Sequence, residues 1–154
     1  MSETTQSPEI RAVVRDGVVR AVAAIGLCGV ALIHLLDFPG KFDETPYMGV
    51  MYLGLMVGSL GLAAALVYTS DSRAWAASGA LVAAVIVGYV LSRTTGLPQA
   101  SDDIGNWSEP LGIASLFVEG SLVALTSGVL FGRRRGLARS VPASRRESRD
   151  LVPA

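Results

Sequence analysis

The sequence has little charge, one cysteine and one histidine, and each scarcity excludes a class of function. Cys28 is the only cysteine, so an internal disulfide and redox chemistry by a Cys-x-x-Cys pair are excluded. His34 is the only histidine, so the chain cannot hold a haem between two histidines. It also has no glycine-rich phosphate loop and no Gly-x-Ser-x-Gly nucleophile motif. We therefore expect neither a catalytic activity nor a cofactor nor a nucleic-acid partner.

Charged residues make up 17% of the chain, against about 25% in an average soluble protein, and long runs carry none. Four runs reach the roughly 20 apolar residues that a helix needs to cross a bilayer, at about 18–36, 46–69, 74–92 and 110–132. The second run has no polar face, which argues against a soluble helix bundle. The sequence thus predicts an all-α, integral membrane four-helix bundle over residues 18–132, with an N-terminal segment at 1–17 and a tail at 133–154.

The basic residues are distributed unevenly along the chain, and this predicts the orientation of the spans. If both termini are cytoplasmic, eleven Lys and Arg residues lie on the cytoplasmic side and only Lys41 and Arg93 lie outside. We therefore expect a multi-pass plasma-membrane protein with both termini inside. The Arg-rich tail shows no apolar periodicity, so we expect it to be disordered and attracted to anionic lipid headgroups.

Small residues predict where the helices approach one another, because close backbone approach stabilises helix pairs in lipid. Gly54, Gly58 and Gly61 form a stripe on the second span, and we interpret it as a packing surface. The fourth span has one polar face, which should turn inward and which consists of Gly112, Ser115, Glu119 and Thr126.

Glu119 is the first candidate functional residue, because an acid deep in a membrane span is costly and commonly functional. One hypothesis makes it a proton carrier or a hydrogen-bond donor. The alternative is structural: a neutral Glu119 that hydrogen-bonds a neighbouring helix at Tyr89, Ser59 or Ser92.

A second group of candidates lies near the outer ends of the helices. His34 and Asp37 share a helix face and are half of a divalent-metal site, or else His34 hydrogen-bonds Asp37 or Arg93. We expect Arg93, with Tyr89 one turn below it, to pair with Asp37 or Glu109. The first outer loop, 37–45, should turn at Pro39-Gly40, and with the loop before Pro110 it could cap the bundle. These two loops contain an acidic cluster of Asp43, Glu44, Asp102, Asp103 and Glu109.

The segments YVLSRTTGLP and NWSEPLGIASLFVEG, with the Ala-, Val-, Gly- and Arg-rich composition, resemble small four-helix membrane proteins of high-GC actinobacteria. The resemblance covers about residues 18–132. It implies a plasma-membrane location, and since no activity is assigned to those proteins it implies no site residues.

Two functions remain open from the sequence. The first is a non-enzymatic accessory or structural subunit, which packs against another membrane protein or forms a homo-oligomer. The alternative is a small binding or transport module, in which an outer polar vestibule leads to Glu119 and admits a cation, a proton or a small polar ligand. Of the two, the sequence favours the accessory subunit.

Overall fold

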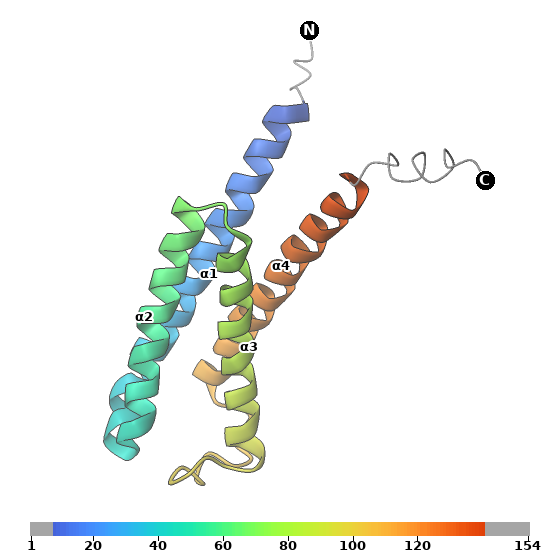
Figure 1. Ribbon diagram of the computed structural model, residues 1–154. Coiled ribbons are helices and arrows are strands. Elements are labelled where there is room, and N and C mark those ends of the chain that lie inside the picture. The colour runs from blue at the N-terminus through green and yellow to red at the C-terminus, as the bar shows by residue number, and fades with distance from the viewer. Residues whose placement is uncertain (1–7, 141–154) are drawn as a thin grey trace, which may run out of the picture.

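The computed structural model describes residues 8–140, which form four helices: α1 (Pro8–Glu44), α2 (Pro46–Tyr68), α3 (Ser72–Thr94) and α4 (Pro110–Ser140). The helices run up and down in chain order, so α1 begins and α4 ends at the same end of the molecule (Figure 1). Each helix contains a stretch long and apolar enough to cross a membrane. The chain is therefore an all-helical, multi-pass membrane protein whose environment is a lipid bilayer.

Local sequence signals begin and end these helices. Pro46 and Pro110 stand at the starts of α2 and α4, where the missing proline N–H is not needed. Asp71 precedes α3, and its carboxylate accepts a 2.9 Å hydrogen bond from the backbone N–H of Arg73. Gly96 follows α3 with a left-handed φ of +78°, which a side chain would disfavour. These signals explain why the predicted boundaries of the second and third spans, and the predicted start of the fourth, lie within two residues of the observed helix ends.

The first helix departs most from expectation. The predicted span at 18–36 lies inside a helix that begins at Pro8 and ends at Glu44. Pro39 lies within α1 and does not form the expected turn with Gly40, although a proline there removes one backbone donor. The connection to α2 is therefore reduced to Thr45, whose N–H donates to the carbonyl of Lys41 at 2.9 Å.

The fourth helix also extends further than predicted. Residues 133–140 continue α4, where the sequence predicted the start of a disordered tail. Arg133 attaches this extension to the bundle, because its guanidinium donates to the carbonyl of Ser70 at 3.0 Å and lies 6.0 Å from the ring centroid of Trp75. The remainder of the predicted tail, 141–154, lies outside the described residues.

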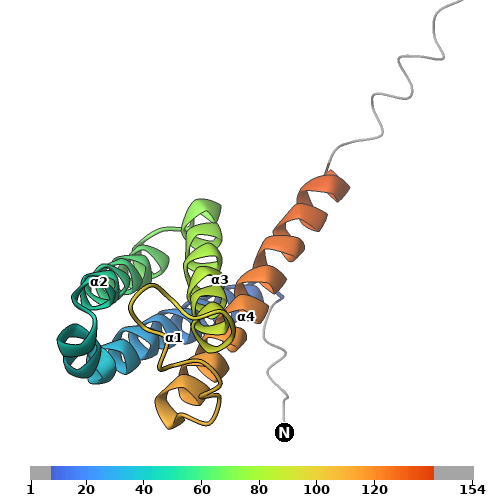
Figure 2. The same ribbon diagram turned by 90° about the horizontal axis from the view of Figure 1, so that it is seen from below.

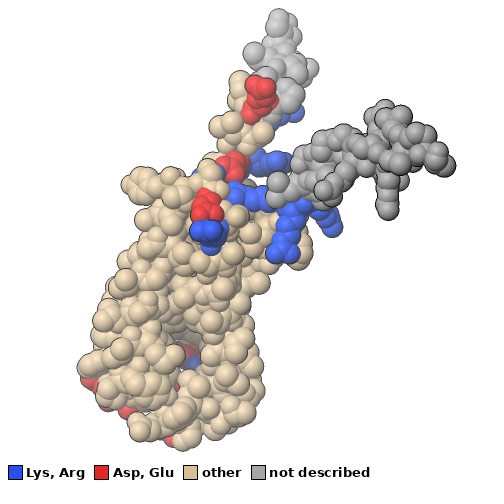
Figure 3. Space-filling view, viewed as in Figure 1, with Lys and Arg blue, Asp and Glu red and all other residues tan. Residues whose placement is uncertain are grey.

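The two ends of the bundle differ in charge. At one end, which we term the basic end, α1 begins, residues 69–71 join α2 to α3, and α4 ends. Arg side chains gather there (Figure 3). Arg20 donates to the carbonyl of Thr69 at 2.7 Å and to Ser70 Oγ at 2.9 Å, so α1 is fixed to the α2–α3 turn. The opposite end, the capped end, consists of Thr45 and the loop 95–109.

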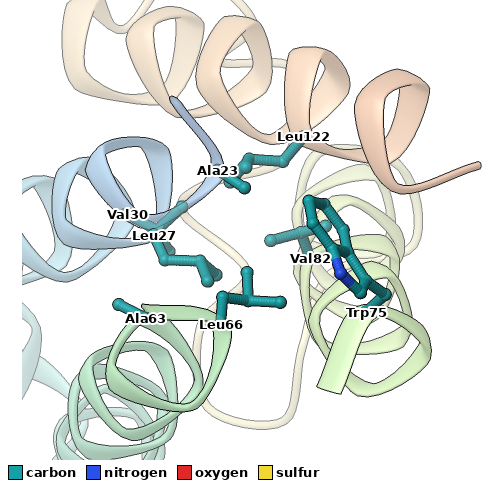
Figure 4. Packing of buried hydrophobic residues seen from close by; sticks show 8 residues of the cluster. All are labelled: Ala23, Leu27, Val30, Ala63, Leu66, Trp75, Val82 and Leu122. Atoms are coloured by element: carbon teal, nitrogen blue, oxygen red, sulfur yellow. The ribbon is translucent and has the colours of Figure 1, made fainter. Parts of the chain in front are cut away.

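The hydrophobic core lies in the half of the bundle next to the basic end. α1 packs most closely on α2 and α3 on α4, whereas α2 and α3 make the fewest contacts of these neighbouring pairs. Trp75 is the largest fully buried side chain. Around it the core brings together residues from all four helices (Figure 4): Ala23, Leu27, Val30, Ala63, Leu66, Val82 and Leu122.

The close helix contacts do not occur at the predicted glycine stripe. A Cβ built on Gly54 or Gly61 meets open space, and one on Gly58 makes only ordinary contact with Leu81 at 3.8 Å. The tight approaches are elsewhere: a Cβ on Gly26 would lie 2.8 Å from Leu122, and one on Gly112 would lie 2.6 Å from Tyr89. The spacing of glycines along α2 was therefore a poor guide to which helices meet.

We expect Gly112→Ala to destabilise the protein by about 1–3 kcal/mol, because the added methyl group would overlap the Tyr89 ring. Gly61→Ala is the matched control, since its methyl group meets open space and alanine favours the helix. Unfolding of both variants in detergent, titrated with dodecyl sulfate and followed by circular dichroism, measures the difference. Equal stability of the two variants would contradict the tight contact between α4 and α3.

Candidate functional site

The guanidinium of Arg93, near the end of α3, is the centre of a charge network under the loop 95–109. Arg93 is only 5% exposed. One Nη nitrogen contacts Asp103 at 2.6 Å and the other contacts Glu109 at 2.5 Å. The predicted pairing with Glu109 is thus confirmed, whereas the alternative partner Asp37 is not used. A buried guanidinium is stable only with such partners, because desolvating an unpaired charge is costly.

Asp103 connects this network to the first helix. Its carboxylate also accepts from Lys41 Nζ of α1, at 3.1 and 3.3 Å. Burial alone would raise the pKa of Asp103, but hydrogen bonds from Lys41 and Arg93 outweigh it and hold the pKa below its ordinary value. A single carboxylate therefore links α1, α3 and the loop at the capped end.

The loop 95–109 is ordered by further contacts with α2 and α3, and it covers the capped end. Tyr47 of α2 donates to the carbonyl of Pro98 at 2.6 Å, and the N–H of Gly105 donates to the carbonyl of Arg93 at 2.9 Å. Figure 2, which looks onto this end, shows the loop reaching from α3 towards α2 before it returns to α4. The expectation of an ordered cap is confirmed for this loop, whereas the predicted first loop is mostly helix.

A cavity of about 370 Å³ lies between the helices below this cap, where α2 and α3 diverge. Residues from all four helices line it. Arg93 and Leu81 both line it from α3, so it extends about 18 Å along the bundle at 1.5 Å per residue. Figure 3 shows a hollow in this half of the molecule, with acidic and basic atoms visible inside it. The charged capped end thus continues into an apolar interior lined by Leu55, Leu81 and Val85.

A second cavity, of about 520 Å³, lies at the surface of the capped end. It is lined by the loop and by the last turn of α1, including Glu44, Gln99, Asp102 and Asn106. Both cavities are lined by the same four charged residues, which we term the charged ring: Asp37, Lys41, Asp103 and Glu109. The interior cavity and the surface cavity therefore meet at this ring.

His34, Tyr52 and Asp37 form a polar group on the cavity wall. The Tyr52 hydroxyl donates to Asp37 Oδ2 at 3.0 Å, and the Tyr52 and His34 rings meet edge to face at 4.8 Å. His34 Nδ1 lies 2.9 Å from the carbonyl of Val30. The expectation that His34 hydrogen-bonds Asp37 or Arg93 was therefore wrong, because the backbone one turn earlier in α1 is its partner.

Tyr89 lies between Arg93 and the fourth helix. Its ring faces the Arg93 guanidinium, with 4.9 Å between the guanidinium carbon and the ring centroid, and packs against Gly112. Its hydroxyl is buried and has no hydrogen-bond partner among residues 8–140. Tyr89 thus supports Arg93 from below by a cation–π contact, and its oxygen remains available for a further hydrogen bond.

Glu119 lies just beyond the cavity and is completely buried. Ser115, which lines the cavity, donates to Glu119 Oε1 at 2.7 Å. The second oxygen, Oε2, has no hydrogen-bond partner within the described part of the chain. The predicted inward orientation of this polar face is confirmed, since Ser115, Glu119 and Thr126 are all buried. The expected cross-helix partners Tyr89, Ser59 and Ser92 are not used, and the observed partner is Ser115, one turn away on α4.

The structure brings together only some of the predicted site residues. His34, Asp37, Tyr89, Arg93, Asp103 and Glu109 all line the interior cavity. Glu44 pairs with Lys41 at 3.2 Å and, like Asp102, lines only the surface cavity, whereas Asp43 lines neither. Gly54, expected to pack helices, instead lines the interior cavity. Within residues 8–140, no three His, Cys, Asp or Glu side chains lie close enough to hold a metal ion, so the suggested His34–Asp37 metal site is not assembled.

Sequence reasoning did not identify two residues that matter in this site. Tyr52 binds Asp37, and Lys41 binds Asp103. Tyr52 is one polar group in a long apolar segment, which was a usable signal, because a membrane-buried hydroxyl needs a partner. Lys41 was counted only as a topology marker. No protein-family model, curated protein or solved structure matches this chain, so these residues are interpreted from the structure alone.

We expect Asp103→Asn to destabilise the capped end by about 2 kcal/mol at neutral pH, because Lys41 and Arg93 lose their shared carboxylate. The neighbouring Asp102→Asn is the control, since Asp102 is exposed and makes no ion pair within residues 8–140. Hydrogen exchange of the loop 95–109, compared between the two variants, measures the effect. Equal protection in both variants would contradict the assigned role of Asp103.

The same network predicts a pH dependence. Because the pKa of Asp103 is below its ordinary value, its stabilising contribution is complete above about pH 4 and is lost as the pH falls through the lowered pKa. The stability difference between wild type and Asp103→Asn should therefore shrink as the pH falls below about 4. A difference that stayed constant down to about pH 2 would argue against an ionised Asp103 in the folded protein.

Proposed function

We propose that this protein is a small ligand-binding module of the membrane, and that the interior cavity is its binding site. The observation that carries the proposal is a cavity of about 370 Å³ with a charged ring at one end and apolar walls below. This volume lies within the range of roughly 300–1,000 Å³ that is usual for small-molecule sites. A mostly apolar cavity with a few convergent polar groups is also the usual composition of such sites.

The interior cavity has two routes of access, and together they favour an amphipathic ligand. The surface cavity at the capped end gives a polar route through the charged ring. The hollow seen in Figure 3 gives a second route on the side of the bundle, where α2 and α3 are furthest apart. A molecule with a polar head and an apolar body can reach the cavity from either medium. Glu119 then lies one hydrogen bond beyond the site, through Ser115, which suits a role in sensing or moving the ligand.

An accessory subunit remains the second candidate function, and one observation favours it. Gly61 is exposed, and the space around its Cβ position is open, so a helix of another protein or of a second copy can approach α2 closely. The same open space is equally well filled by lipid. The accessory function does not explain the interior cavity. A helix bundle that serves only as a scaffold would be more stable if side chains filled this space.

We further propose that the basic end faces the cytoplasm and that the membrane is the plasma membrane. Arg residues are concentrated at this end, in agreement with the positive-inside rule (Figure 3). Arg residues there, such as Arg11, Arg15 and Arg73, are suited to contact anionic headgroups. In this orientation the cavity opens towards the outside of the cell.

The orientation predicts opposite labelling of two cysteine variants in a Cys28→Ser background. Ser101→Cys in the loop should react with a membrane-impermeant maleimide in intact cells, because the capped end faces outwards. Ser72→Cys at the start of α3 should react only after the membrane is permeabilised. Both serines are exposed, so access to the reagent depends on the side of the membrane. The reverse pattern would place the basic end outside.

The binding function predicts that Gly54→Leu blocks the cavity. We would measure equilibrium dialysis of benzyl methyl sulfone and of N,N-dimethylbenzylamine against protein in phosphatidylcholine nanodiscs, with empty nanodiscs as background. Wild type should bind at least one probe saturably, and Gly54→Leu should weaken that binding about tenfold or more, a loss of roughly 1.4 kcal/mol. A Cβ atom at this position meets no atom within 4 Å, so the leucine side chain starts from open space and we expect the fold to be retained.

Gly61→Leu is the matched control for this experiment. It places the same side chain into open space on the same helix, but Gly61 does not line the cavity. It should bind the probes as wild type does. If neither probe binds saturably, or if the two leucine variants behave alike, the proposed binding site is wrong and the accessory function is favoured.

A further inference from the structure

We infer that the interior cavity selects a protonated amine, whose N–H group binds at Asp37 and His34 while its apolar body lies against Leu55, Leu81 and Val85. The inference rests on the proposed binding function and adds the chemical class of the ligand. Two observations support this ligand class: some of the charges in the cavity are already paired, and some of its hydrogen-bonding groups have no partner among the described residues.

The charges that line the cavity favour a cation. Asp37, Asp103 and Glu109 are acidic, and only Lys41 and Arg93 are basic. Both basic groups are neutralised by carboxylates, since Lys41 contacts Asp103 and Arg93 contacts Asp103 and Glu109. Asp37 makes no ion pair among residues 8–140, and its observed partner is the neutral Tyr52 hydroxyl. Asp37 is therefore the carboxylate with a charge left to satisfy.

The hydrogen-bonding groups beside Asp37 require a donor from the ligand. A backbone carbonyl can only accept, so His34 Nδ1 carries the hydrogen that is shared with Val30. In the neutral ring Nε2 is then an acceptor, and the structure gives it no partner within the described residues. His34 is only 6% exposed as a residue, and it lines the cavity. A cationic N–H group complements both the His34 acceptor and the Asp37 carboxylate.

Two unpaired donors on the opposite wall do not favour an anion. Arg93 Nε and the Tyr89 hydroxyl are buried without hydrogen-bond partners in the described chain. The positive charge of Arg93 is, however, already balanced by the two carboxylates at its Nη groups. These donors suit a neutral oxygen on the ligand. An anionic head would instead lie within a cavity whose net charge is negative.

The test compares four probes that share a benzyl group and differ in the head. N,N-dimethylbenzylamine is protonated at pH 7 and carries a cationic N–H, whereas benzyltrimethylammonium has the charge without the N–H. Benzyl methyl sulfone is neutral, and benzylsulfonate is an anion. Phosphatidylcholine nanodiscs at fixed pH and salt keep the membrane itself from sorting the probes by charge.

We expect wild type to bind the amine about tenfold or more tightly than the sulfone, with the quaternary cation between them and the sulfonate weakest, because charge-assisted hydrogen bonds are the stronger ones. Asp37→Asn should remove most of the preference for the amine while the sulfone still binds, since asparagine can still accept from Tyr52. Asp43→Asn, on the same helix but outside both cavities, should keep the preference.

Wild-type selectivity decides the inference even if a variant fails to fold. Equal binding of amine and sulfone, tighter binding of the sulfonate, or a preference that survives Asp37→Asn would overturn it. In those cases the proposed binding function would still hold if Gly54→Leu weakens the binding of a probe. If all four probes fail to bind saturably, both the inference and the proposed function are wrong.

Discussion

The burial of one guanidinium group, that of Arg93, determines how the capped half of this protein is built. A cation at 5% exposure requires carboxylates, and here they come from the loop at Asp103 and from the start of α4 at Glu109. Asp103 in turn holds Lys41 of α1. The loop, α1, α3 and the residue that precedes α4 are therefore fixed by a single connected network, which includes three of the four residues of the charged ring. The remaining helix, α2, is attached at this end by two hydrogen bonds: Tyr47 donates to the backbone carbonyl of Pro98, and Tyr52 donates to the carboxylate of Asp37.

This network allows the bundle to be hollow where it would otherwise be packed. In lipid, helices gain little from burying apolar surface, so close packing and polar contacts hold them together. The half near the basic end uses packing, with Trp75 and Leu27 fully buried among all four helices (Figure 4). The other half uses polar contacts at the cap, and these hold the helix ends without filling the space below. α2 packs chiefly on α1, and α3 packs chiefly on α4. α2 and α3 are therefore separated from each other.

The sequence predicted the elements of this fold better than their contacts. Bilayer thickness and turn residues such as Pro46 and Pro110 gave the helices, since both signals act locally. α1 and α4 extended further than hydropathy indicated, because Lys41 and Arg133 make contacts distant in sequence that stabilise the extra turns. Gly54 illustrates the other limit. The spacing of Gly54 matched a packing stripe, but the residue lines the cavity. Whether a small residue contacts a helix or a cavity depends on the distance between two helices. The sequence pattern of one helix does not contain that distance.

The candidate site was predicted residue by residue but not as an arrangement. Arg93, Asp37, His34 and Glu119 stood out because charge in or beside a span is costly. Their partners did not follow from sequence, since His34 and Glu119 both bond groups one turn away in their own helices and not the partners that were expected. Those local choices have a chemical consequence. Because its Nδ1 bonds the carbonyl of Val30, His34 is not the hydrogen-bond partner of Asp37, and its Nε2 is an acceptor to which no described residue donates. The proposed ligand would supply this donor, and its apolar body would lie against the apolar walls of the cavity.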